Sequence, residues 1–145
     1  ARALGIDEEP IRAGVESFEG VPGRLQFIRE VGGIKIYNDN NATTPEATVA
    51  ALRAVGGNKK NTILITGGAD KGLDMSALVS EIQQYCKKVL LLAGTGTERV
   101  RFELRNSLIY QTVSEALDDA VAAAEFGDTE DALASAANSG AAAAS

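Results

Sequence analysis

Two uninterrupted apolar runs in the middle of the chain determine the expected fold. Residues 62–65 (TILI) and 89–92 (VLLL) contain no charged side chain, a pattern typical of strands that are buried on both faces of a parallel sheet. Helices are expected after these runs, near 75–85 and 98–104, followed by a short strand at 109–110 and a helix at 114–124. This alternation predicts an α/β fold with an open, mostly parallel sheet and helices on both faces.

The segment before these runs predicts a hairpin and a capped helix. Residues 25–31 alternate as in a strand, Gly32-Gly33 is a turn signal, and residues 34–37 suit a second strand. We therefore expect an antiparallel edge on the sheet. Thr44, Pro45 and Glu46 suit the cap and first turn of a helix. The small residues expected to pack this helix closely on the sheet are Ala47, Ala50, Ala51 and Ala54.

Two changes in composition divide the chain. Two glycines and a proline fall within residues 20–23, which is typical of a hinge. Residues 1–20 are therefore expected to be the tail of a preceding domain, and 21–131 the main domain. Residues 132–145 contain eight Ala and three Ser and are expected to be a tail whose role the sequence leaves open. Because the first residue is not Met, we expect a piece of a longer protein.

Composition excludes several kinds of site and partner. The 145 residues carry a formal net charge of −6, so we expect no nucleic-acid partner, because that binding depends on Lys and Arg neutralising phosphates. The chain has no histidine and one cysteine, Cys86, which excludes a Ser-His-Asp triad, a His-ligated metal and a disulfide. Cys86 is expected to be an inert helix residue. No apolar run reaches the roughly 20 residues that span a bilayer, so we expect no membrane partner.

Polar loops follow three of the expected strands, at 39–43, 67–72 and 94–97. The carboxyl ends of parallel strands meet at one edge of a sheet, and ligands of open α/β sheets bind there. The residues predicted to share this edge are Asp39, Thr43, Lys71 and Thr95.

Each loop taken alone leaves two interpretations open. Thr43 precedes a helix N-terminus, which suits an anion, but an ordinary capped loop has the same sequence. Lys71 in GGADKG is either a charge for a carboxylate or phosphate, or a solvated turn residue. The loop is not a Walker A motif, because the lysine of that motif follows its second glycine. The GTGTER segment has Arg99 where a dinucleotide fingerprint has glycine.

The joint order of these motifs resembles the C-terminal domain of the Mur ligases. The matching segments are GVPGRLQFIREVGGIKIYNDNNATTPEATVAAL, ILITGGADKG and KKVLLLAGTG, and the similarity is closest to the branch that adds D-glutamate to UDP-N-acetylmuramoyl-L-alanine. The resemblance implies a Rossmann-like domain of a three-domain, cytoplasmic bacterial enzyme of peptidoglycan synthesis. It also implies ATP and Mg²⁺ as cofactors of the full-length enzyme, held largely by its central domain, with the N-terminal and central domains as partners.

The resemblance assigns roles to six residues. It implies nucleotide contacts for Arg24, Asp39 and Asn41, and D-glutamate contacts for Thr43, Lys71 and Ser139. Gly23 and Gln26 stand where the family has His and Glu, and Asn41 stands where it has a Lys beside the phosphates. The loss of that Lys does not exclude ligase activity but weakens assignment to the D-glutamate branch. No catalytic residue and no metal ligand is assigned within the chain.

The chain alone is expected to be folded but inactive, because it has no phosphate loop to position ATP. Two alternatives stay open: a sister Mur ligase that adds another amino acid, and a non-catalytic α/β module that binds an acidic small molecule. A G-K-[ST] phosphate loop some 200 residues upstream in the parent protein would favour the ligase.

Overall fold

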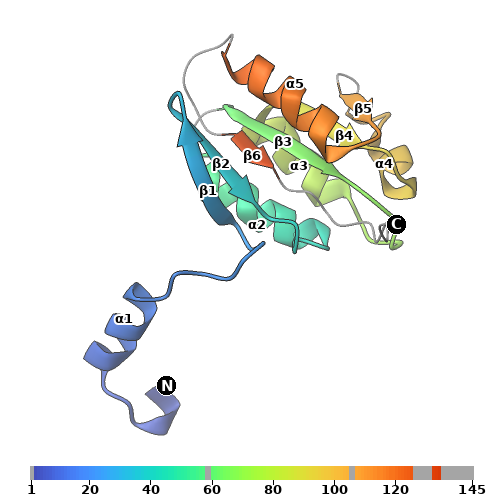
Figure 1. Ribbon diagram of the computed structural model, residues 1–145. Helices are drawn as coiled ribbons and strands as arrows, with labels where there is room; N and C mark the ends of the chain where they lie inside the picture. Colours follow the sequence, from blue (N-terminus) through green and yellow to red (C-terminus); the bar gives the residue numbers. More distant parts are fainter. Residues whose placement is uncertain (1, 58–59, 105–106, 126–131, 135–145) are drawn as a thin grey trace, which may run out of the picture.

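The computed structural model describes residues 2–57, 60–104, 107–125 and 132–134. It shows one six-stranded sheet with helices on both faces (Figure 1), which confirms the predicted fold class. The strands are β1 (Gln26–Val31), β2 (Ile34–Asn38), β3 (Thr62–Gly67), β4 (Cys86–Leu92), β5 (Leu108–Tyr110) and β6 (Ala132–Ala134). The helices are η1 (Arg2–Leu4), α1 (Glu8–Glu16), α2 (Pro45–Val55), α3 (Ser76–Tyr85), α4 (Thr95–Val100) and α5 (Val113–Glu125).

The sheet has the strand order β1-β2-β6-β3-β4-β5. Only β1 and β2 pair antiparallel, through the turn at Gly32-Gly33, and every other neighbouring pair is parallel. The predicted antiparallel edge is therefore confirmed. Because β2, β3 and β4 run in the same direction, the loops that follow them emerge at one edge.

Strand β6 was not predicted. Its three residues lie between β2 and β3, with Ala132 opposite both Ile36 and Ile63, although the sequence placed them at the start of an Ala/Ser-rich tail. A stretch of small residues carries no alternation of large apolar and polar side chains, so the pattern that identifies other strands is missing here. The backbone of this segment completes the parallel sheet.

Two apolar clusters lie on opposite faces of the sheet. On one face, α2, α3 and α4 cover β3 and β4, and the fully buried side chains there include Leu52, Leu64 and Leu91. On the other face, α5 packs Ala116, Ala120 and Ala124 against Ile63, Ile65 and Leu90. The buried positions of α5 are small residues, whereas those of α2 and α3 include Val49, Leu52, Leu78 and Ile82.

Helix α2 begins where the sequence predicts. The Thr44 hydroxyl accepts a hydrogen bond from the Ala47 amide at 3.4 Å, with Pro45 in the first turn. Its buried face differs from the prediction, because Val49, Ala51 and Leu52 are buried while Ala50 and Ala54 are exposed. The larger side chains bury more apolar area than a row of alanines, and this sets the orientation of the helix.

Two further expectations are wrong in detail. Cys86 is the first residue of β4, not part of a helix; it is buried, and burial raises the pKa of its thiol to about 12. Helix α4 begins at Thr95, three residues before the predicted start, so most of the expected third loop is helical.

The N-terminal helix lies apart from the sheet (Figure 1). None of the residues of α1 is buried. The segment between α1 and β1 contains Gly20 and Gly23, both with positive φ, as expected of a turn or hinge that bulkier residues would strain.

Candidate functional site

The three polar loops meet at the carboxyl edge of the parallel strands. The Lys71 Nζ donates a hydrogen bond to the Thr43 carbonyl oxygen at 3.0 Å, which joins the loop after β3 to the loop before α2. The Asp70 amide donates to the Thr95 Oγ1 at 2.8 Å, which joins the same loop to α4. Thr43, Lys71 and Thr95 therefore share one edge as predicted, and Asp39, the fourth residue of that prediction, directly follows β2 at the same edge.

Glycines allow the loops after β3 and β4 to touch. A Cβ atom on Gly94 would lie 2.4 Å from the carbonyl oxygen of Gly68, and the Gly96 amide donates a hydrogen bond to that same oxygen at 2.9 Å. No L side chain fits at such a distance from backbone. The contact of these two loops thus depends on the glycines of the GTG segment.

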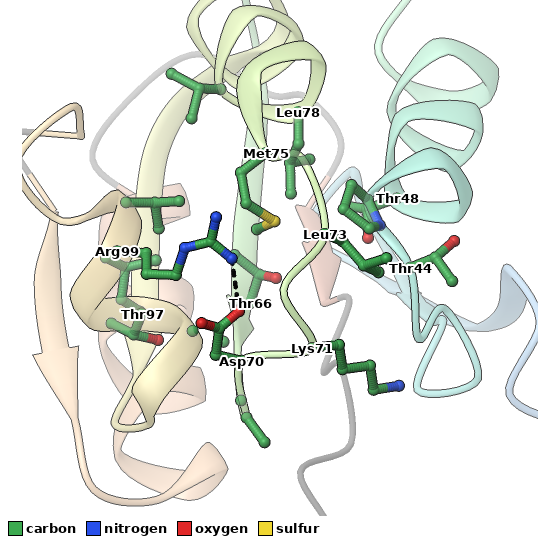
Figure 2. Close-up of a pocket in the computed structure, with 18 of the residues that line it drawn as sticks. Thr44, Thr48, Thr66, Asp70, Lys71, Leu73, Met75, Leu78, Thr97 and Arg99 are labelled. Atoms are coloured by element: carbon green, nitrogen blue, oxygen red, sulfur yellow. Dashed lines mark hydrogen bonds and ion pairs between the residues drawn. The ribbon is translucent and has the colours of Figure 1, made fainter.

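A pocket opens between these loops, with a volume of about 720 Å³ that includes the open solvent at its mouth. Its rim is polar, with Thr43, Asp70, Lys71 and Arg99, and its floor is apolar and reaches the buried side chains of the first face. Figure 2 shows Arg99 reaching Asp70 and the Lys71 side chain extending away from Arg99, with Met75, Leu73 and Leu78 above Thr66. Other lining side chains belong to Thr44, Pro45, Thr48, Thr97, Val79, Ile82, Leu91, Val100 and Leu104.

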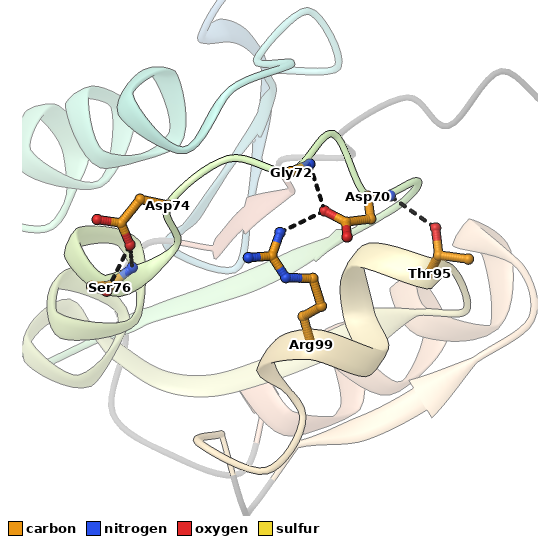
Figure 3. A network of polar contacts seen from close by, with 6 residues as sticks. All are labelled: Asp70, Gly72, Asp74, Ser76, Thr95 and Arg99. Atoms are coloured by element: carbon orange, nitrogen blue, oxygen red, sulfur yellow. Dashed lines mark hydrogen bonds and ion pairs between the residues drawn. The ribbon is translucent and has the colours of Figure 1, made fainter.

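Asp70 is the centre of the polar network at the rim (Figure 3). Its Oδ1 accepts hydrogen bonds from the Gly72 amide at 2.8 Å and from the Arg99 Nη1 at 2.6 Å. Both bonds favour the ionised carboxylate and hold the pKa of Asp70 below its ordinary value. The bond from the Gly72 amide has the larger effect and the bond from Arg99 the smaller one. Asp70 therefore carries a full negative charge beside Arg99 at neutral pH.

The residues expected to contact a nucleotide do not line the pocket. They lie in or beside the segment that joins α1 to β1, residues 17–25, which we call the linker. Asp39 is buried, and its Oδ1 accepts a hydrogen bond from the Leu25 amide at 2.8 Å; Leu25 has a φ of +43°, which is uncommon for a residue with a branched side chain. The Asn41 Nδ2 donates to the Pro22 carbonyl oxygen at 3.0 Å. Burial raises the pKa of the Asp39 carboxyl, and the Leu25 amide and the exposed Arg24 offset part of this rise. Ser139 lies outside the described residues.

Removing the Asp39 carboxylate is expected to destabilise the domain. Asp39→Ala leaves the Leu25 amide without its acceptor, which costs about 1–3 kcal/mol of unfolding free energy, whereas Asp39→Asn keeps an oxygen at that place and costs less. Urea unfolding compares the two variants with wild type. Equal stability of all three would show that the Asp39–Leu25 bond does not hold this turn.

The Asp39 carboxyl also makes the free energy of unfolding depend on pH. Burial is the largest influence and raises the pKa of Asp39 above 3.8, so the folded chain binds this proton more tightly than the unfolded chain. The contribution of Asp39 to stability therefore falls as the pH rises from 3.8 through the raised value. Unfolding of Asp39→Asn, measured from pH 4 to pH 7, should lack this component.

Arg99 and Asp70 were not predicted as site residues. In the sequence, Arg99 stands out only as a mismatch to a dinucleotide motif. Because α4 starts at Thr95, Thr95 and Arg99 are four residues apart and lie on one face of the helix, from which both reach Asp70. The spacing TxxxR directly after a buried strand is the signal that could have found them.

Within the described ranges, no cluster of three or more His, Cys, Asp or Glu residues is arranged to hold a metal ion. No helix among these residues has the length and apolar character needed to cross a bilayer. The rim instead offers one ammonium, one guanidinium and one carboxylate, a set of groups suited to a small molecule with charged ends.

Solved structures share this fold at low sequence identity. MurF from Acinetobacter baumannii aligns with a TM-score of 0.67 and 17% identity, covering 94% of this chain and 32% of that one. FolC from E. coli in complex with ADP aligns with a TM-score of 0.62 and 23% identity, covering 93% of this chain and 33% of that one. In both, the matched part is about a third of a longer chain.

Proteins related by sequence have a higher identity to this chain than these solved structures have. A UDP-N-acetylmuramoylalanine–D-glutamate ligase from Roseiflexus sp. (strain RS-1) is 41% identical over 105 residues, which is 72% of this chain and 22% of that protein. The protein of the same name from Caldanaerobacter subterraneus is 31% identical over 131 residues, 86% of this chain and 28% of that protein. The chain thus spans less than a third of either relative. The family model described as "Mur ligase, glutamate ligase domain" matches residues 23–143, and the chain therefore belongs to this family.

Proposed function

We propose that this chain is the C-terminal domain of an ATP-dependent ligase that adds D-glutamate to UDP-N-acetylmuramoyl-L-alanine in bacterial peptidoglycan synthesis. The observation that carries the proposal is the pocket at the carboxyl edge, where Lys71 and Thr43 lie in direct contact in a chain of the Mur ligase family. The domain binds the incoming amino acid at this pocket and closes over ATP held by the rest of the protein.

The reaction proposed for the whole enzyme is amide formation through an acyl phosphate. ATP phosphorylates the carboxylate of the UDP-sugar substrate, the amine of D-glutamate attacks the acyl carbon, and phosphate leaves. This chain supplies binding and orientation: the Lys71 ammonium pairs with a carboxylate of the amino acid, and Thr43 lies where the N-terminus of α2 favours negative charge. Holding the amine against the acyl phosphate makes the attack effectively unimolecular.

The remaining assignments belong to the same proposal. Residues 1–20 are the end of a central domain that holds ATP and Mg²⁺, and 21–131 form the amino-acid-binding domain. Arg24, Asp39 and Asn41 lie at the linker between them, on the side where a closed form would bring the nucleotide. Ser139 is proposed as a further D-glutamate contact. The full-length enzyme is proposed to act in the cytoplasm.

The test is ATP-dependent product formation by the full-length protein. With UDP-N-acetylmuramoyl-L-alanine and D-glutamate we expect ADP, phosphate and the dipeptide product, and with other amino acids much less. The isolated chain should show no ATP turnover, because its sequence contains no phosphate loop. Product formation with a different amino acid would indicate a sister ligase. Binding of D-glutamate without any ATP-dependent product would indicate a binding module instead.

A further inference from the structure

The pocket rim has two cationic side chains, and they are bonded to different kinds of partner. Among the described lining residues, Lys71 and Arg99 are the only cations. The Lys71 Nζ is bound to a neutral backbone oxygen, the Thr43 carbonyl, whereas Arg99 is bound to a carboxylate, Asp70. Arg99 comes from α4 and reaches Asp70, whereas the Lys71 side chain extends away from Arg99 toward the loop before α2, so the two charges lie on different sides of the loop after β3 (Figure 2).

The Arg99 guanidinium retains unused binding capacity. Its Nη1 contacts Asp70 at 2.6 Å, and the structure shows no other hydrogen bond from this side chain to the described residues. A guanidinium has five N–H donors in a planar fork, and its geometry matches a carboxylate bidentately. The side chain is 42% exposed, so an arriving ligand can reach it without opening the core.

The rim charges match a substrate with two carboxylates. Lys71 and Arg99 contribute +2 and Asp70 contributes −1, so the lining carries a net charge of +1. An amino acid with a neutral side chain is a zwitterion of net charge zero, and one with a second carboxylate has a net charge of −1. Asp74 is not counted in this charge, because it does not line the pocket although it lies near Arg99. Its Oδ1 accepts hydrogen bonds from the amide and the hydroxyl of Ser76 (Figure 3).

From this arrangement we infer that Arg99 recognises the second carboxylate of a dicarboxylic amino acid, and that Asp70 pairs with Arg99 when the pocket is empty. The inference rests on the proposed function and adds its specificity-determining residue. Lys71 and Thr43 hold one carboxylate; Arg99, from the other side of the loop after β3, holds the other. Asp70 keeps the guanidinium facing the rim through its bonds to Arg99 and to the loop backbone.

The test compares D-glutamate with D-glutamine in the full-length enzyme, because the two differ little in size but only one has the second charge. In Arg99→Leu we expect kcat/KM for D-glutamate to fall about 10- to 150-fold, the range for one charge-assisted hydrogen bond. For D-glutamine we expect a change of less than about threefold. Where D-glutamine is not turned over, its inhibition constant gives the same comparison. Arg99→Lys should recover part of the preference, since it restores the charge without the fork.

Arg101→Leu is the matched control, because Arg101 is exposed at the end of α4 and does not line the pocket. It removes a guanidinium without touching the rim, so use of both amino acids should be unchanged. If Arg99 acted only by holding the loop through Asp70, Arg99→Leu and Asp70→Asn would weaken both amino acids equally, and that result overturns the inference. An unchanged preference for D-glutamate in Arg99→Leu also overturns it while leaving the ligase assignment intact. A wild-type enzyme that uses no dicarboxylic amino acid contradicts the proposed function itself.

Discussion

Lys71→Ala in the full-length enzyme is expected to raise the KM for the amino acid about 10- to 150-fold. The range corresponds to the loss of one charge-assisted hydrogen bond of roughly 1.5–3 kcal/mol. The Lys71 Nζ lies 3.0 Å from the Thr43 carbonyl oxygen, and an ammonium has three donors, so it can keep this bond and still hold a carboxylate. The KM for the UDP-sugar should stay nearly unchanged, because that substrate is proposed to bind other domains.

Steady-state kinetics with each substrate varied separately measures this effect. Lys87→Ala is a suitable control, because Lys87 is exposed on β4 and does not line the pocket. It removes the same charge from the domain without touching the rim. If the KM change falls on the UDP-sugar, or if Lys71→Ala behaves like the control, Lys71 is a solvated turn residue.

The interior strands could be predicted because their burial is visible in the sequence. Residues 62–65 and 89–92 lie within β3 and β4, where Ile63, Leu64 and Leu90 are almost fully buried. Burial on both faces demands apolar side chains at every position, and the short length of each run, with glycines soon after it, favours a strand over a buried helix. The cap of α2 was equally visible, since Thr44 and Pro45 have local effects that do not depend on the rest of the fold.

Features that depend on tertiary contacts could not be predicted. Strand β6 has three residues, of which only Leu133 is large, and only its neighbours β2 and β3 show that it is a strand. The orientation of α2 follows from what packs on it, so the row of alanines was misleading. Helix α4 begins directly after Gly94 because its N-terminus packs on the loop after β3, a contact between segments about 25 residues apart.

The candidate site was only partly predicted, because some of its contacts follow from the strand order and others from tertiary packing. Thr43 and Lys71 were found because the carboxyl ends of parallel strands share an edge, whatever the details of packing. The contact between Asp70 and Arg99 joins residues that are 29 positions apart, and the only local signal for it is the TxxxR spacing after β4. The nucleotide roles of Asp39 and Asn41 came from the resemblance alone, and their observed hydrogen bonds go to the linker at Leu25 and Pro22.

Gly94→Ala is expected to damage both stability and the site. The added Cβ would lie 2.4 Å from the oxygen and 2.8 Å from the carbonyl carbon of Gly68. Both are backbone atoms, so the clash cannot be relieved by turning a side chain and must push the two loops apart. Overpacking of this kind costs about 1–3 kcal/mol. Separation of the loops also weakens the bond from the Asp70 amide to Thr95, on which the position of Asp70 beside Arg99 depends.

Urea unfolding of the chain and the KM for the amino acid in the full-length enzyme measure the two effects. Gly14→Ala is the control, because Gly14 lies in α1 with nothing within 4 Å of an added Cβ, and alanine in a helix interior is favoured over glycine by up to about 1 kcal/mol. We therefore expect Gly14→Ala to unfold at the same or a higher urea concentration than wild type, and Gly94→Ala at a lower one with a raised KM. If Gly94→Ala matched wild type in both measurements, the close contact of the loops after β3 and β4 would not be what shapes the pocket.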